Sequence, residues 1–203
     1  MCPSQWPAHL GSIRQWHWIS SAISLFAMLM FAFTGITLNH ASDISADIEV
    51  TTIETQLPQQ LLTLLETTKH GPLPLALRRW LRTQHDLHIN TNRPPEWSED
   101  ELYLELPRPG GDAWLSIDLS NGELLYELTQ RGTISYLNDL HKGRHTGRAW
   151  FWFIDVFGAA CAVFCITGLL LLYRHANPRP TTWPLVALGM VIPTLLIIVF
   201  VHP

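Results

Sequence analysis

Three long stretches of the chain carry almost no charge, and they limit what it can fold into. Residues 19–38 contain no charged side chain, residues 149–173 contain only Asp155, and residues 181–201 again contain none. At a rise of about 1.5 Å per residue, a helix of this length crosses a hydrocarbon layer about 30 Å thick. We therefore predict three transmembrane helices, at residues 19–40, 149–174 and 181–202.

Residues 41–140 have the composition of a soluble domain. Of the 17 acidic residues, 16 lie between Asp43 and Asp139, against 10 basic residues between Lys69 and Arg148. This acidic balance argues against nucleic acid as a partner, because nucleic acid binding needs a basic patch. All three cysteines lie outside the segment and no C-x-x-C-H motif occurs, which argues against a disulfide framework and against covalently attached haem.

The hydrophobic pattern of this middle segment changes from helical to alternating. Leucines at helical spacing predict helices over residues 56–69 and 73–87. Alternation then predicts strands at residues 101–106, 113–119 and 123–129, with Asn121-Gly122 as a hairpin turn between the last two. We expect a small α+β domain, helices first and strands after them, inserted between the first and second membrane helices.

No catalytic motif occurs in this domain: it contains no G-x-S-x-G, no H-E-x-x-H and no glycine-rich phosphate loop. His85 and His88 stand three residues apart and could share a metal ion. The alternative is that they are exposed histidines at the end of a helix. The domain therefore has the character of a recognition or spacing module, and we look for chemistry in the membrane helices.

Positive charges near the helix ends give the expected orientation. Arg174 and Arg179 flank the short connection at residues 175–180, and short connections follow the positive-inside rule best. We therefore place this connection and residues 1–18 in the cytoplasm. Residues 41–140 and the connection at residues 141–148 then lie on the outer side.

Histidines lie at the ends of the first two predicted membrane helices. In this topology His17 and His175 share the cytoplasmic boundary, and His40, His141 and His145 share the outer one. Two neutral imidazoles from different helices can ligate a b-type haem without a covalent link. The alternative is that they are interfacial residues of the surrounding tryptophan belts. The matched pairs favour non-covalent haem b, and leave open whether one or two haems bind.

The two histidine-flanked helices resemble each other in sequence. The first reads W-H-W at residues 16–18 and F-T-G at 33–35, and the second reads W-F-W at 150–152 and I-T-G at 166–168. Because they run in opposite directions, a pseudo-twofold axis in the membrane plane would relate them. Such an axis would relate a site at one boundary to an equivalent site at the other.

The segments R-Q-W-H-W…F-T-G-I-T-L-N-H and Y-L-N-D-L-H-K-G-R…W…I-D…T-G-L-L-L resemble the PepSY-associated transmembrane helix proteins of bacterial inner membranes. The resemblance covers the first two membrane helices, and residues 72–129 are compatible with a PepSY-like domain. Larger relatives with four helices are associated with haem-dependent reduction of ferric siderophores in the periplasm. The resemblance implies a multi-pass inner-membrane protein whose middle domain is periplasmic.

Residue by residue, the resemblance implies that His17, His40 and His141 bind haem iron. The topology adds His175 as the partner of His17, and His145 stands as the alternate to His141 in the outer site. The resemblance further implies electron transfer from a quinol or a cytoplasmic reductase to a periplasmic acceptor, as in a ferric reductase.

Arg144 and Arg148 stand beside the outer histidines and would hold haem propionates or an anionic substrate, with headgroup anchoring as their alternative role. Two other functions stay open at this point. One is a non-redox, membrane-tethered PepSY-like module that binds or regulates a partner. The other is a cofactor-free subunit of a larger redox complex. The sequence does not say whether the chain acts alone, as a homo-oligomer or as a complex subunit.

Overall fold

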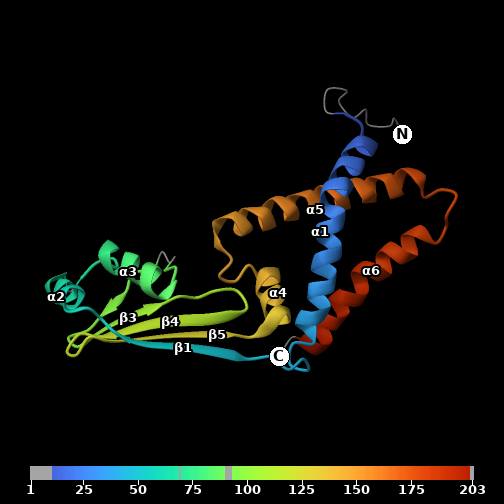
Figure 1. The fold of residues 1–203 in the computed structure, drawn as a ribbon. Coiled ribbons are helices and arrows are strands. Elements are labelled where there is room, and N and C mark those ends of the chain that lie inside the picture. Colours follow the sequence, from blue (N-terminus) through green and yellow to red (C-terminus); the bar gives the residue numbers. More distant parts are fainter. Residues whose placement is uncertain (1–10, 69, 90–92, 202–203) are drawn as a thin grey trace. The chain divides into compact units, whose positions relative to one another are not determined.

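The computed structural model describes residues 11–68, 70–89 and 93–201, and its elements are shown in Figure 1. The chain divides into two compact units. The first, here called the membrane unit, consists of Met1–Met30 and Trp152–Pro203. The second, here called the sheet unit, is Phe31–Phe151.

Three helices of the described chain are long and apolar enough to cross a membrane. They are α1 (Ile13–Asn39), α5 (Gly147–His175) and α6 (Thr182–Leu196), the last continued by the π-helical turn η2 (Ile197–Val201). Only 17%, 6% and 0% of their most apolar windows are buried within the protein. Apolar surface on this scale needs a hydrocarbon environment. The prediction of three helices that are long and apolar enough to span a membrane is confirmed.

The sheet unit contains a five-stranded antiparallel sheet with the strand order β1-β5-β4-β3-β2. Its strands are β1 (Glu49–Gln56), β2 (Glu96–Trp97), β3 (Glu101–Glu105), β4 (Gly111–Asp118) and β5 (Glu123–Gln130). Helices α2 (Gln59–Thr68) and α3 (Leu75–His85) precede the strands β2 to β5 and lie on one side of the sheet in Figure 1. The expected insertion of a small sheet domain between the first and second membrane helices is confirmed.

The core of this domain is built almost entirely from leucine and isoleucine. Along β4 the buried side chains alternate with half-buried ones, as expected for a strand with one face on a core. The residues buried to less than 2% come from α2, α3 and the strands β3 to β5: Leu65, Leu77, Leu81, Leu102, Leu104, Leu115, Ile117 and Leu124. Packing of the helical leucines onto the sheet therefore holds the domain together.

The predicted hairpin between β4 and β5 is present and closes with Gly122 at φ 80°, a conformation that favours glycine. Asp118 accepts hydrogen bonds from the Ser120 hydroxyl at 2.6 Å and the Ser120 amide at 2.8 Å. These bonds lower the pKa of the Asp118 carboxyl below its ordinary value. The hairpin turn is thus stabilised by a side chain as well as by its glycine.

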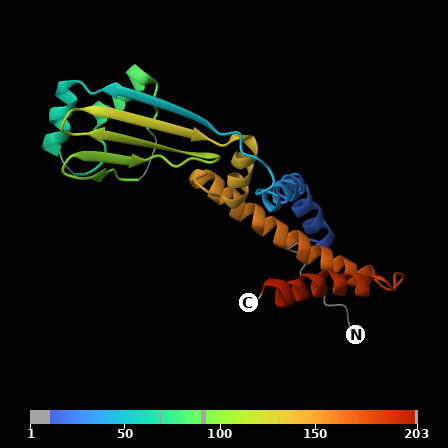
Figure 2. The same cartoon turned by 90° about the horizontal axis from the view of Figure 1, so that it is seen from below.

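Two strands and a helix of the sheet unit were not predicted from the sequence. The domain opens with the edge strand β1 rather than with a helix, and β1 pairs along its whole length with β5, as Figure 2 shows. Most of its residues are exposed, so it lacks the alternation of a half-buried strand. The short strand β2 was also missed, and the predicted helix at 56–69 begins only at Gln59 because β1 occupies the preceding residues.

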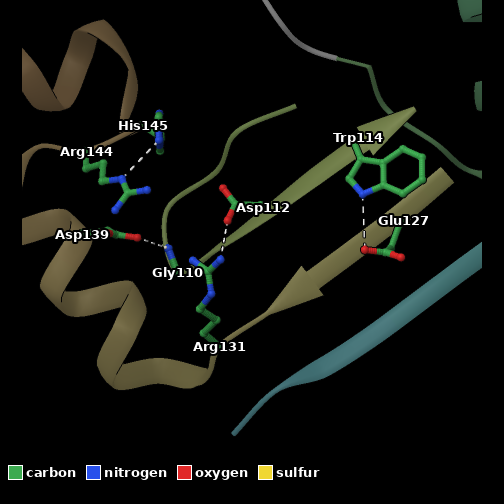
Figure 3. Close-up of polar contacts among 8 residues, drawn as sticks. All are labelled: Gly110, Asp112, Trp114, Glu127, Arg131, Asp139, Arg144 and His145. Carbon is green, nitrogen blue, oxygen red and sulfur yellow. Dashed lines mark hydrogen bonds and ion pairs between the residues drawn. The ribbon is translucent and has the colours of Figure 1, made fainter. Parts of the chain in front are cut away.

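The unpredicted helix is α4 (Gly132–Lys142), which lies where the sequence suggested the end of the domain and a connection. It ends at Gly143, whose φ of 66° is typical of a helix C-cap. Its Asp139 carboxylate accepts a hydrogen bond from the Gly110 amide at 2.8 Å, and Arg131 before the helix pairs with Asp112 of β4 (Figure 3). The helix is therefore attached to the β3–β4 turn.

Replacement of Gly111 by alanine should destabilise the sheet unit. A Cβ atom there would lie 2.1 Å from the carbonyl oxygen of Thr129, which is backbone of the neighbouring strand and cannot move aside. We expect the free energy of unfolding to fall by about 1–3 kcal/mol, the usual cost of overpacking. Urea denaturation of the purified protein measures it.

The control for this substitution is Glu99→Ala, an exposed position in the same domain. Surface substitutions usually change stability by less than about 0.5 kcal/mol. If the two variants had the same denaturation midpoint, the close approach of Gly111 to β5 would be wrong.

Candidate functional site

In the membrane unit, His17 of α1 lies against one face of α5. Its Nδ1 atom is 3.0 Å from Thr167 Oγ1, and its ring stacks on Phe164 with the ring centroids 4.8 Å apart. Gly168 makes room for the ring, because a Cβ atom there would lie 3.3 Å from His17 Cε1. Phe164, Thr167 and Gly168 stand at positions i, i+3 and i+4 and therefore share one face of the helix.

The hydrogen bonds of Thr167 determine which nitrogen of His17 carries the proton. The Thr167 hydroxyl donates to the carbonyl oxygen of Val163 at 2.7 Å, within its own helix. Its single proton is then in use, so its oxygen accepts from His17 Nδ1–H. In the neutral ring this leaves Nε2 with a free lone pair, the form in which histidine binds a metal.

His175, at the end of α5, makes a comparable Nδ1 hydrogen bond to a different acceptor. Its Nδ1 lies 2.9 Å from the backbone carbonyl oxygen of Leu171, and a carbonyl can only accept. Neither Nε2 of His17 nor that of His175 takes part in a hydrogen bond among the described residues. In the neutral form of each ring, the lone pair is then on Nε2.

His17 and His175 line one cavity in the membrane unit. Its volume is about 400 Å³, and its remaining walls are Gly168, Leu171, Leu172, Ala176, Arg179 and Thr182. The lining is mostly apolar, with one guanidinium group at Arg179. Two imidazole nitrogens, apolar walls and a cation are the groups that hold a b-type haem, its porphyrin and its propionates. The residues present therefore fit this group.

In the sheet unit, His141 of α4 contacts α1 in the same way. Its Nδ1 lies 2.7 Å from Thr34 Oγ1, and its ring centroid is 5.0 Å from that of Phe31. The Thr34 hydroxyl also donates within its own helix, to the Phe31 carbonyl oxygen at 3.2 Å. A Cβ atom at Gly35 would lie 3.6 Å from the His141 ring. His141 thus contacts the same three residue types as His17, although its ring is tilted by 46° to the phenylalanine where that of His17 is stacked at 13°.

The sequence repeat between the two helices is therefore also a repeat of tertiary contacts. In each, an F-x-x-T-G segment, residues 31–35 of α1 and 164–168 of α5, receives a histidine from a different helix. Sequence reasoning noticed the Thr-Gly pairs but missed their role as histidine acceptors. The signal that could have found it was the phenylalanine three residues before each threonine.

The other predicted outer-site residues are exposed. His40 Nδ1 lies 3.3 Å from the Asp43 carboxylate, and 59% of the His40 side chain is accessible. Arg144 Nε donates to His145 Nε2 at 3.3 Å (Figure 3), so the ligating nitrogen of His145 is engaged. Arg148 is also exposed. The structure thus brings His17 and His175 to one cavity, whereas His40 contacts Asp43 and His141 contacts Thr34.

His85 and His88, the alternative pair of metal ligands, contact different residues. The His85 ring packs edge-on against Trp80 with centroids 5.0 Å apart, and His88 Nδ1 lies 3.2 Å from the Asp86 carbonyl oxygen. Across residues 11–68, 70–89 and 93–201 no group of three or more His, Cys, Asp or Glu is arranged to hold a metal ion. A haem iron with two axial histidines needs no such group.

Three apolar helices and an antiparallel sheet domain inserted after the first of them define a multi-pass membrane protein. A family model with the description "Putative PepSY_TM-like" matches residues 8–202 of the chain, and the protein belongs to this family. The predicted membership of the PepSY-associated transmembrane proteins is confirmed. No curated protein and no solved structure gave a match.

Leucine at position 168 should disrupt the contact between His17 and α5. Because even a Cβ atom would lie 3.3 Å from the His17 ring, the longer side chain must displace it from Thr167 and Phe164. We expect a loss of about 1–3 kcal/mol, seen as a lower midpoint in thermal unfolding of the detergent-purified protein followed by circular dichroism.

The matched control is Gly158→Leu in the same helix, where nothing lies within 4 Å of the new Cβ atom. Leucine has a better helix propensity than glycine, so this variant should unfold at the same temperature or higher. Equal destabilisation by both substitutions would argue against the packing of His17 on α5.

Proposed function

We propose that this protein binds a b-type haem between His17 and His175 and passes electrons across the bacterial inner membrane to a periplasmic acceptor. The observation that carries the proposal is the cavity in the membrane unit, where two histidines, each hydrogen-bonded through Nδ1, line the same largely apolar space. Two neutral imidazoles are the ligand set of b-type cytochromes, which makes electron transfer the chemistry that the site supports best.

Bound haem would supply a one-electron redox centre within the membrane. The chain's own residues would bind and orient it. Thr167 fixes the tautomer and the ring orientation of His17, the function that hydrogen-bonded second-shell groups have in metal sites. Leu171 and Leu172 would exclude water, and Arg179 would bind a propionate.

A second haem in the sheet unit is the natural extension of the proposal. His141 has the same hydroxyl and ring contacts as His17, which supports a ligand role for it. His40 is the better candidate for its partner, because Arg144 already occupies His145 Nε2. Arg144 and Arg148 would then serve the propionates or an anionic acceptor.

The direction of transfer in this proposal follows from the charges around α5 and α6. Arg174 and Arg179 flank the short connection between these helices, which supports a cytoplasmic position for it. Electrons would enter there from a quinol or a cytoplasmic reductase. The sheet domain would face the periplasm and bind the acceptor, for which a ferric siderophore is the proposed example. The protein would then act as a ferric reductase.

A reduced-minus-oxidised visible spectrum of the detergent-purified protein tests the proposal. We expect a b-type spectrum that His17→Ala and His175→Ala each diminish, because each would remove one of the two histidines proposed to hold the haem. His88→Ala is the control, since its ring is bonded to Asp86 in the sheet domain and should leave the spectrum unchanged.

Haem quantified per chain distinguishes one site from two. If a second haem is present, His141→Ala should remove it and leave the His17 site intact. A colourless protein after expression with ample haem would contradict electron transfer. It would leave a membrane-tethered PepSY-like binding or regulatory module, or a cofactor-free subunit of a larger complex.

Thr167→Val tests the role of the threonine separately from the ligands. Valine keeps the size of the side chain but cannot accept the proton of His17 Nδ1, so the ring loses its orientation. Loss of a second-shell partner typically weakens metal binding by about 10–100-fold. Haem titration of the apoprotein, followed by absorbance, should show a reduction of this size.

Thr194→Val is the matched control for this substitution. The Thr194 hydroxyl lies in α6 and donates at 2.8 Å only to the Met190 carbonyl oxygen of its own helix. Its loss should leave haem affinity within about two-fold, because no histidine depends on it. If both variants bound haem as the unchanged protein does, Thr167 would have no part in presenting His17.

A further inference from the structure

Helix α3 presents a cluster of arginines to a cavity in the sheet unit. Arg78, Arg79 and Arg82 line this cavity together with His88, and its apolar walls are Leu75, Leu87 and Ile89. Its volume is about 500 Å³. Sites for small molecules usually measure about 300–1,000 Å³, so the cavity has the size of a ligand site.

These three arginines have no counter-charge in the described part of the chain. Two other arginines of the same domain are paired, Arg93 with Glu105 and Arg131 with Asp112, whereas Arg108 has no ion pair among the described residues. No ion pair is present for Arg78, Arg79 or Arg82 among the described residues. The domain is rich in carboxylates, yet its folding leaves this cluster of positive charge uncompensated.

The Nε atom of Arg78 adds a second, independent observation. It is buried and has no hydrogen-bond partner among the described residues. A buried donor on a charged group is costly to leave unsatisfied, and proteins rarely do so. Arg78 as a whole is only half-buried, so the rest of its guanidinium group can form charge-assisted bonds to a ligand in the cavity.

The chemistry of the lining indicates the class of ligand. Guanidinium groups bind carboxylates and phosphates through paired, nearly parallel N–H···O bonds. Three of them around one cavity fit an anion with more than one negative charge, and Leu75, Leu87 and Ile89 fit an apolar part of the same molecule. His88 adds an imidazole to the lining. Its Nδ1 atom lies 3.8 Å from the carboxylate of Asp86, whose side chain is 95% exposed.

A second, smaller cavity shares part of this lining. Leu87, His88 and Ile89 also line a space of about 150 Å³ together with Arg108. This places a fourth arginine at a space next to the same three residues. We propose that the α3 cavity is a binding site for a small polyanion, a polycarboxylate or polyphosphate that carries an apolar portion.

Calorimetric titration of the full-length protein in an uncharged detergent tests this site. Citrate tests binding of a polycarboxylate, and pyrophosphate tests binding of a polyphosphate. Sodium chloride at matched ionic strength is the blank. We expect saturable binding of one of the two anions. Arg82→Ala should weaken it by about ten-fold or more, the usual effect of losing a charge-assisted bond.

Arg78→Lys and Arg93→Ala make the test specific. The lysine variant keeps the positive charge and the helix but removes the paired N–H donors of the guanidinium group. The affinity for the anion should therefore fall several-fold, while the midpoint of thermal unfolding stays unchanged. The Arg93 variant loses one positive charge elsewhere in the domain and should bind within two-fold of the unchanged protein.

Two results would overturn the proposal. The first is the absence of saturable binding of both anions at millimolar concentration. The second is an equal loss of affinity in the Arg82→Ala and Arg93→Ala variants, which would mean that the anion responds to net charge and not to this cavity. Unchanged affinity in Arg78→Lys would contradict the role given to the Arg78 guanidinium group in this site.

Discussion

A threonine hydroxyl has one proton, and the arrangement of the histidines depends on where that proton goes. Thr167 donates it to the backbone of its own helix, and Thr34 does the same in α1, so each hydroxyl oxygen is left to accept from a histidine Nδ1. In the neutral form of each ring, the lone pair is then on Nε2 of His17 and of His141. A glycine after each threonine and a phenylalanine before it complete a surface on which an imidazole can lie.

The same motif leads to different surroundings in the two units. In the membrane unit the His17 site opens onto a cavity that a second histidine, His175, also lines. In the sheet unit the two candidates for a second ligand, His40 and His145, are exposed, and His145 already accepts a hydrogen bond from Arg144. This difference is why the electron-transfer proposal rests first on the membrane unit and only by extension on His141.

In the sheet domain, the apolar and the charged residues of α3 have different roles. Leucines on one face of α3 form the core with the strands, which positions the opposite, arginine-bearing side of the helix beside the segment Leu87–Ile89. The packing of Leu77 and Leu81 thus determines where Arg78 and Arg82 can point. If the domain binds the acceptor of the proposed electron transfer, an anionic ligand at this cavity would be one way to recognise it.

The sequence alone determined the three membrane helices, the insertion between them and most strands, because length, charge and short-range periodicity carry that information. It also singled out the histidines and the Thr-Gly repeat. It could not determine that His17 meets Thr167, 150 residues away, or that the polar strand β1 pairs with β5. It also gave no sign that three arginines share one cavity. Only the tertiary structure decided these points, because each depends on packing between segments that are remote in the chain.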